Sequence, residues 1–230
     1  MGLQLVTPPA AGEPISLNQA KDHLHIPQSD ISQDTWIGTA ITAARMIMES
    51  SRYPGLDICF KTQTWNLILD SFPPDGTQFI EIPKRPVQSV ASITYVDIAG
   101  NSVVWPNTNY KVDPYAPLGN DTGPTRIAPV QAGSAVGVWP TVTPGVSLQA
   151  INGVIVQFVA GYGTDVTLVP APLQLSMLML MATLFENREA TGDVGDVPNV
   201  PNVARMVRVP VTVPFGYDML TNIYRGDGIA

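Results

Sequence analysis

The chain has 230 residues, of which 45% are hydrophobic, so it can bury a core for one large domain or two small ones. Its net charge of −7 argues against a surface that holds nucleic acid through phosphate contacts. The single cysteine, Cys59, excludes an internal disulfide, and the N-terminus lacks the regions of a signal peptide. Only 13% of residues are charged, about half the usual share, so much of the surface is neutral and suits subunit contact.

The N-terminal part predicts an extended arm followed by two helices. Residues 1–14 contain three prolines and are expected to be extended. Ser16 and Gln19 have the spacing of a capping box and predict a short helix that Pro27 ends. A second helix is predicted over 35–51, from an apolar stripe at helical spacing that consists of Ile37, Ile41, Ala44 and Met48.

The middle of the chain changes from helical to alternating periodicity, which predicts β-strands. Gly100 and Asn101 are expected to form a two-residue hairpin turn. Gly161 and Gly163 follow the most apolar strand, but they lack the spacing of a phosphate-binding loop and predict a tight turn. Strands are predicted over 62–70, 79–82, 87–98, 102–105, 110–113, 126–128 and 154–160.

A long uncharged run follows, with no charged residue from Ala171 to Phe185. It predicts a helix over 171–190 that is buried on nearly all sides, either as the core helix of one domain or as a helix shared between the core and neighbouring subunits. The run is too short to span a bilayer, which takes about 20 residues. Residues 191–214 contain too many prolines for a helix, but 207–213 alternate valine with other residues, which suits an arm that adds to a sheet edge or lies on a neighbour.

Together these patterns predict an α+β fold: a small helical bundle, made of two N-terminal helices and one long apolar helix, with a β-rich insert between the helices and an extended C-terminal arm. The expected parts are the N-terminal arm and bundle helices at 1–61, the β-rich insert at 62–163, the long core helix at 164–192, and the C-terminal arm with a short terminal helix at 193–230.

Residues with catalytic or metal-binding chemistry are few and scattered. His23 and His25 lie two apart, which puts them on different faces of a helix and argues against a zinc site. Cys59 has no histidine nearby and is expected to be buried. Glu186 and Glu189 are expected to pair with arginines. We therefore predict no catalytic, cofactor-binding or metal-binding residue, no cofactor and no enzymatic activity.

A set of segments, taken in order along the chain, carries a resemblance to a known family: EPISLNQAKDHLHI, TQTWNLILDSFP, PVQSVASITYVD, FVAGYG, VPAPLQ, ENREA and VPFGYDMLTNIYR. Together they resemble the tailed-phage head–tail connector (adaptor) proteins, in the subfamily also found in prophages and gene transfer agents. The resemblance covers most of residues 13–225 and implies a small helical bundle with a β insert, assembled as a ring, usually a dodecamer, docked under the portal. The family has no known catalytic residues, and residues 191–214 are longer here than is usual in it.

The resemblance implies a structural protein of the virion neck, between capsid and tail, assembled in the host cytoplasm. The expected form is an adaptor ring of 12 subunits below the portal protein, which meets a head-closure or tail-completion protein and lets DNA pass without specific binding; no membrane is involved. One alternative is that the chain is itself a head-closure or tail-completion protein. The other is a carbohydrate- or receptor-binding β module, suggested by the aromatic residues Trp65, Trp105, Tyr110 and Trp139.

The C-terminal arm is the expected docking element. Its alternating valines offer one face and free backbone groups to the portal or to an adjacent subunit. The alternative is that the arm folds back on the β insert of its own chain. The residues expected to bind the partner are Arg205, Val207, Arg208, Val209, Val211, Val213, Phe215 and Tyr217.

Overall fold

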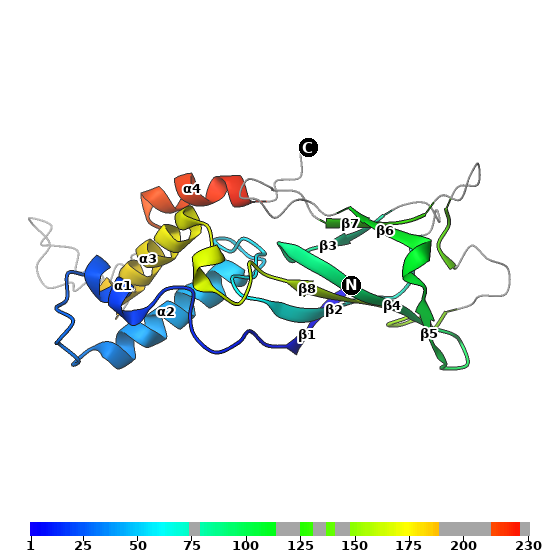
Figure 1. Ribbon diagram of the computed structural model, residues 1–230, viewed down its shortest axis with the longest axis horizontal. Helices are drawn as coiled ribbons and strands as arrows, with labels where there is room; N and C mark the ends of the chain where they lie inside the picture. Colours follow the sequence, from blue (N-terminus) through cyan, green and yellow to red (C-terminus); the bar gives the residue numbers. More distant parts are fainter. Residues whose placement is uncertain (74–78, 114–124, 131–136, 141–147, 189–212, 226–230) are drawn as a thin grey trace, which may run out of the picture.

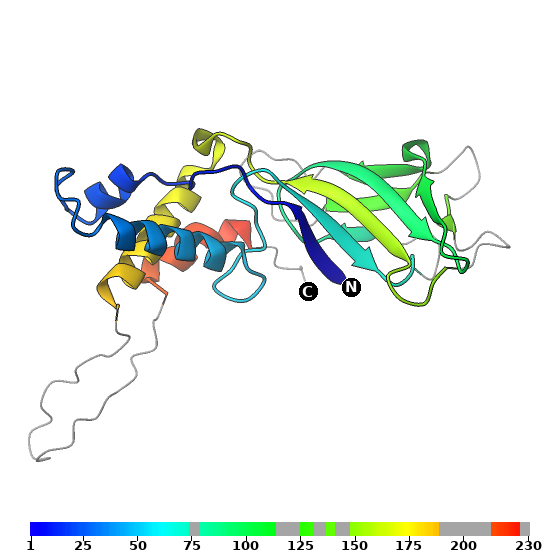
Figure 2. The ribbon, with the colours of Figure 1, turned by 90° about the horizontal axis from the view of Figure 1, so that it is seen from below.

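A computed structural model describes residues 1–73, 79–113, 125–130, 137–140, 148–188 and 213–225. The molecule is elongated, with the helices gathered in a lobe at one end and the strands in a lobe at the other (Figure 1). Figure 2 shows the same two lobes from below, with the N-terminus on the strand side. The two lobes have separate hydrophobic cores.

The helical lobe contains four α-helices within the described residues. They are α1 (Leu17–His23), α2 (Asp34–Glu49), α3 (Ala171–Glu186) and α4 (Phe215–Thr221). Helix α3 lies between α2 on one side and α4 on the other (Figure 1). The described residues also include the short 3₁₀ turns η1 (Asn107–Asn109), which precedes β6 (Tyr110–Asp113) in the strand lobe, η3 (Val166–Leu168) and η4 (Asn222–Tyr224).

Local sequence explains how α1 begins and which side of α2 is buried. The capping box is present at α1, because the Gln19 backbone N–H donates to the Ser16 hydroxyl at 3.2 Å and the Ser16 N–H donates to the Gln19 side chain at 2.8 Å. Helix α2 buries the predicted stripe, with Ile37 and Met48 fully covered. Both helices therefore pack as their apolar periodicity indicates.

The strand lobe is built from two antiparallel sheets. The larger has the order β1-β2-β8-β4-β5 and the smaller the order β3-β7-β6. Strand β8 (Val154–Ala160), the most apolar strand, is central in the larger sheet. Its Val156 lies opposite Leu67 of β2 and opposite Ile93 of β4. The bounds are β1 (Gly2–Thr7), β2 (Gln63–Leu69), β3 (Ile80–Ile82), β4 (Val87–Val96), β5 (Ser102–Trp105), β6 (Tyr110–Asp113), β7 (Thr125–Pro129) and β8 (Val154–Ala160).

The predicted helical bundle is wrong as a description of the fold. The described residues are mostly β-rich, with sheets of five and three strands, whereas two of the four helices have only seven residues. The N-terminal arm is itself part of the larger sheet, because β1 pairs with β2 from Gly2↔Ile68 onward. The paired residues are 57 (Thr7↔Thr64) to 66 (Gly2↔Ile68) positions apart, so local sequence does not reveal the pairing.

The apolar helix is also shorter and less buried than its sequence indicates. Helix α3 ends at Glu186 and has 16 residues, the same number as α2. Leu173, Met177 and Leu180 are buried, but Leu175 is 40% exposed. The helix therefore has one covered side and one side open to solvent, and it does not organise a long bundle.

Candidate functional site

The candidate catalytic and metal-binding residues are not assembled into a site. His23 ends α1, and His25 lies in the following turn with a φ of 57°. Among the residues that the structure describes, no group of three His, Cys, Asp or Glu side chains could hold a metal ion. In the same residues, no helix has the length and apolar character needed to cross a membrane.

Cys59 is buried, as predicted from its surroundings in the sequence. Burial, together with the negative charge of Glu49, raises the pKa of its thiol to about 12. The thiolate that a nucleophile needs is therefore scarce near neutral pH. Cys59 packs in the core of the strand lobe.

The Gly161–Gly163 segment is a tight turn, as predicted. Both glycines have positive φ, 129° and 138°, which side chains with a Cβ rarely adopt. A Cβ at Gly161 would lie 2.3 Å from the carbonyl oxygen of Lys61, so only glycine fits. The turn lets the chain leave β8 while its backbone lies close to the start of β2.

The residues expected to bind a partner fall into two groups. Val213 and Tyr217 lie together on the core of the helical lobe, where Tyr217 is fully buried and its hydroxyl donates to the Pro54 carbonyl at 2.7 Å. Phe215 begins α4. Helix α4 thus stays with the helical lobe and anchors the C-terminal end of the arm. The other members lie outside the described residues: Arg205, Val207, Arg208, Val209 and Val211.

The aromatic residues that suggested a carbohydrate-binding surface are mostly internal. Trp139 is fully buried, and Trp105 and Tyr110 are 9% and 7% exposed. Their rings stack within the strand core, with the Trp105 centroid 5.0 Å from Trp139 and 5.6 Å from Tyr110. Trp65 is half-buried, and its indole N–H donates to Gln63. These four rings therefore form no exposed platform for a sugar.

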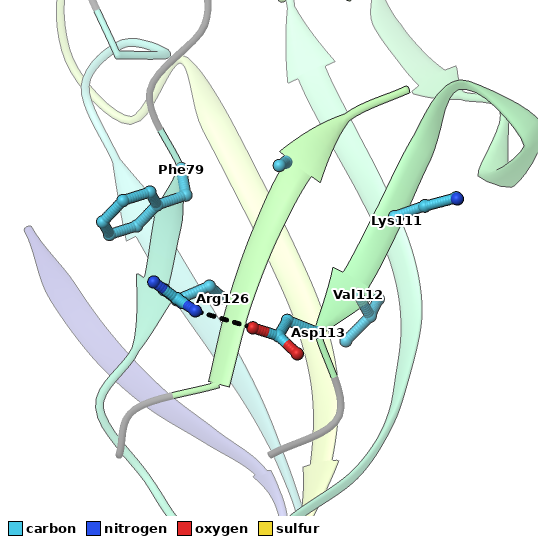
Figure 3. Close-up of a pocket in the computed structure, with 6 residues that line it drawn as sticks. Phe79, Lys111, Val112, Asp113 and Arg126 are labelled. Atoms are coloured by element: carbon cyan, nitrogen blue, oxygen red, sulfur yellow. Dashed lines mark hydrogen bonds and ion pairs between the residues drawn. The ribbon is translucent and has the colours of Figure 1, made fainter. Parts of the chain in front are cut away.

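A shallow depression of about 380 Å³ lies on the smaller sheet (Figure 3). Arg126 contacts two other residues of its lining. Its guanidinium lies 2.8 Å from the Asp113 carboxylate and 5.1 Å from the centre of the Phe79 ring. Lys111, Val112 and Ala128 complete the lining. The charge of Arg126 is already paired, so the depression presents a mixed surface without a free charged group at its centre.

A polar network that the sequence did not reveal joins the two lobes. The Arg45 guanidinium contacts the Glu13 carboxylate at 2.7 Å and the Glu49 carboxylate at 2.9 Å. The other oxygen of Glu49 accepts hydrogen bonds from the Phe60 N–H at 3.1 Å and from the Gln63 amide at 3.0 Å. Burial opposes the charge on Arg45, but its bonds to the two carboxylates raise its pKa overall. The network ties α2 to the start of β2.

Two buried lysines, Lys61 and Lys84, reinforce this connection through backbone carbonyls. Lys84 donates to the Glu49 carbonyl and lies 3.6 Å from the Asp57 carboxylate. Lys61 donates three hydrogen bonds, of 2.9, 2.7 and 3.1 Å, to the carbonyls of residues 10–12. A third buried lysine, Lys21, donates to carbonyls of residues 28 and 30 within the helical lobe. Lysine is usually exposed, so a sequence pattern does not indicate these buried roles.

The Lys61 contacts give a first prediction. Lys61→Met keeps the length of the side chain but removes all three hydrogen bonds to residues 10–12. We expect a loss of about 1–3 kcal/mol in the free energy of unfolding, and faster hydrogen exchange in β1. Urea denaturation and exchange mass spectrometry measure both. Lys111→Met, on the exposed side of β6, is the control and should change neither; equal losses in the two variants would contradict the role given to Lys61.

Comparison with known proteins identifies the fold. No protein-family model and no curated protein matches the chain. A chain of the neck of an empty GTA particle, computed with C6 symmetry, is similar with a TM-score of 0.65 and 20% identity, and the match covers 98% of this chain and 95% of that chain. The chain has the fold of a neck protein chain.

Two further solved structures agree with that match. A chain from the virion of a native gene transfer agent (GTA) particle has a TM-score of 0.63 and 20% identity, with 98% of this chain and 95% of that chain covered. A chain from the neck of the native GTA particle, computed with C12 symmetry, has a TM-score of 0.56 and 18% identity with the same coverage. Because 98% of this chain is covered, the shared fold includes both the helical lobe and the strand lobe.

Proposed function

We propose that the chain is a structural protein of a phage-type virion neck, and more specifically a head–tail connector (adaptor). The observation that carries the proposal is the similarity to a GTA neck chain over 98% of this chain and 95% of that chain. Similarity over nearly the whole of both chains means that they share the same pair of lobes. No catalytic role is proposed for any residue.

The proposed form is a ring of 12 subunits. In support, the neck assemblies that contain the similar chains were computed with C6 and C12 symmetry. The low charged fraction of 13% also suits a chain whose surface is partly covered by neighbours. The net charge of −7 on each chain, repeated around the ring, would let DNA pass through the opening without being held.

The proposed partners are the portal protein on one side of the ring and a head-closure or tail-completion protein on the other. The arm at 193–212 is the proposed portal-docking element, with Arg205, Arg208 and the valines at 207, 209 and 211 as its contact residues. Helix α4 holds the end of this arm on the helical lobe through Val213 and Tyr217. The proposed location is the virion neck, after assembly in the host cytoplasm.

Assembly with a portal protein tests the proposed function. We expect the purified chain to be monomeric or weakly associated by itself, and to form a ring when the portal of the same particle is added, because the portal supplies the template. Native mass spectrometry gives the number of subunits, and electron microscopy shows the ring. A stable small dimer that forms no ring on the portal would overturn the proposal, and a ring that binds only the tail side would favour the head-closure alternative.

A further inference from the structure

Two exposed faces with uncharged centres lie on opposite sides of the helical lobe. Helix α3 packs between α2 and α4, so the outer sides of α2 and α4 point away from each other (Figure 1). Each of these two helices buries one side against the lobe, and helical periodicity places its exposed residues on the opposite side. The two faces differ in composition and are described in turn.

The α4 face consists of Tyr53, Asp218, Met219, Ile223 and Arg225. Met219 is 81% exposed and Ile223, one turn further along, is 46% exposed, whereas Tyr217 on the inner side is fully buried. Tyr53 is held beside them, since its hydroxyl donates to Asp218 at 3.2 Å and the Arg225 guanidinium lies 4.9 Å from the centre of its ring. The face is therefore apolar at its centre and is preformed by contacts within the chain.

The α2 face consists of Thr35, Trp36, Thr39 and Met46, and Met46 is 62% exposed. No charged residue occurs from position 35 to position 44, which is unusual for the solvent side of a helix. At one end of the face, Arg188 lies over the Trp36 ring at 5.4 Å. Arg188 is exposed and has no carboxylate partner in the part of the chain that the structure describes.

We infer that the α4 face of one subunit packs against the α2 face of a second copy of this chain, and that this contact repeats around the ring. The inference rests on the proposed function, because it identifies the surfaces that would build the proposed ring. A head-to-tail contact needs two different faces on different sides of the subunit, whereas a two-fold contact uses one face twice. The opposite placement of the two faces is the arrangement that a ring requires.

Charge and chemistry match across this contact. The α4 face carries the Asp218 carboxylate, which contacts Arg225 of the same face at 2.6 Å but is still 52% exposed. The exposed guanidinium of Arg188 lies at one end of the α2 face, where the Asp218 carboxylate of a neighbouring subunit could meet it. The centre of both faces is uncharged and contains a methionine, a side chain that adapts to irregular apolar surfaces. A different protein bound to the lobe would account for one face, whereas a second copy of the chain accounts for both.

Cysteine cross-linking tests the contact. The full-length double variant Met46→Cys, Met219→Cys is mixed with the portal protein and treated with a short bismaleimide. We expect a ladder of covalent dimers, trimers and larger species on a denaturing gel. Each single variant should remain monomeric, and a mixture of the two single variants should stop at dimers. Wild-type chain gives the background, because Cys59 is buried and burial raises its pKa to about 12.

Two outcomes would overturn the inference. Dimers from either single variant alone would indicate a two-fold contact, and an equal ladder from a Met46→Cys, Ile98→Cys control would indicate non-specific collision, since Ile98 lies 71% exposed in the strand lobe. Electron microscopy of the wild-type chain separates this inference from the proposed function. If the wild-type chain forms a ring but the double variant gives no ladder, the inferred contact is wrong and the proposed function stands. If the double variant gives a ladder but the wild-type chain forms no ring, the contact stands and the proposed function is wrong.

Discussion

Leu180→Asp is expected to remove a large part of the free energy of unfolding. Leu180 is 3% exposed and lies on the side of α3 that packs in the helical core. The substitution removes the packing of a large apolar side chain and buries a carboxylate without a partner, at a cost of at least about 4 kcal/mol. A domain of this kind is stable by only about 5–15 kcal/mol. Urea denaturation followed by circular dichroism measures the loss.

The matched control is Leu175→Asp, which makes the same chemical change one and a half turns away on the same helix. Leu175 is 40% exposed, so the new carboxylate can stay in water. We expect a change of less than about 1 kcal/mol. If the two variants lost the same stability, α3 would not have the covered and open sides described above.

Substitutions in the arm are expected to abolish binding to the portal while leaving the fold intact. The variant replaces Val207, Val209 and Val211 by serine and Arg205 and Arg208 by glutamate. It removes the apolar face and reverses the positive charge that the arm would offer to a partner. We expect at least a tenfold weaker affinity for portal-containing capsids, measured by co-sedimentation, and a melting temperature within about 2 °C of the wild-type value.

The structure decides how this experiment must be designed. A truncation before α4 would remove Tyr217 and Tyr224 from the helical core and would unfold the lobe for reasons unrelated to docking. The control replaces Val103 and Val104 on the exposed edge strand β5 by serine and should bind the portal normally. A large fall in the melting temperature of the arm variant would mean that the arm folds back on its own chain. Unchanged binding would mean that another surface docks.

The sequence by itself determined the elements whose signals are local. The capping box at Ser16 and the apolar stripe of α2 both appear in the structure as predicted, since each depends on residues within a few turns of one another. The central strand β8, Val154–Ala160, has the predicted bounds because a short apolar run between turn residues, here interrupted only by Gln157, is typical of a buried strand. The hairpin after β4 was placed correctly, but its turn is longer than two residues, because Asp97 accepts hydrogen bonds from both Gly100 and Asn101.

Only the tertiary structure decided which elements share a core. Residues 2–7 read as an arm because nothing near them in the sequence indicates their partner strand, yet they extend the larger sheet through backbone hydrogen bonds to β2. The apolar composition of α3 predicted a helix that is buried on nearly all sides. Composition does not determine how many neighbouring elements pack against a helix, and here α2 and α4 leave Leu175 exposed. A buried lysine is costly unless it is hydrogen-bonded, and for Lys61 three carbonyl groups from residues 10–12, about 50 positions away in the chain, compensate that cost. These contacts join residues that are far apart in the sequence and contribute to the free energy of folding. A periodic pattern over a few residues therefore cannot predict them.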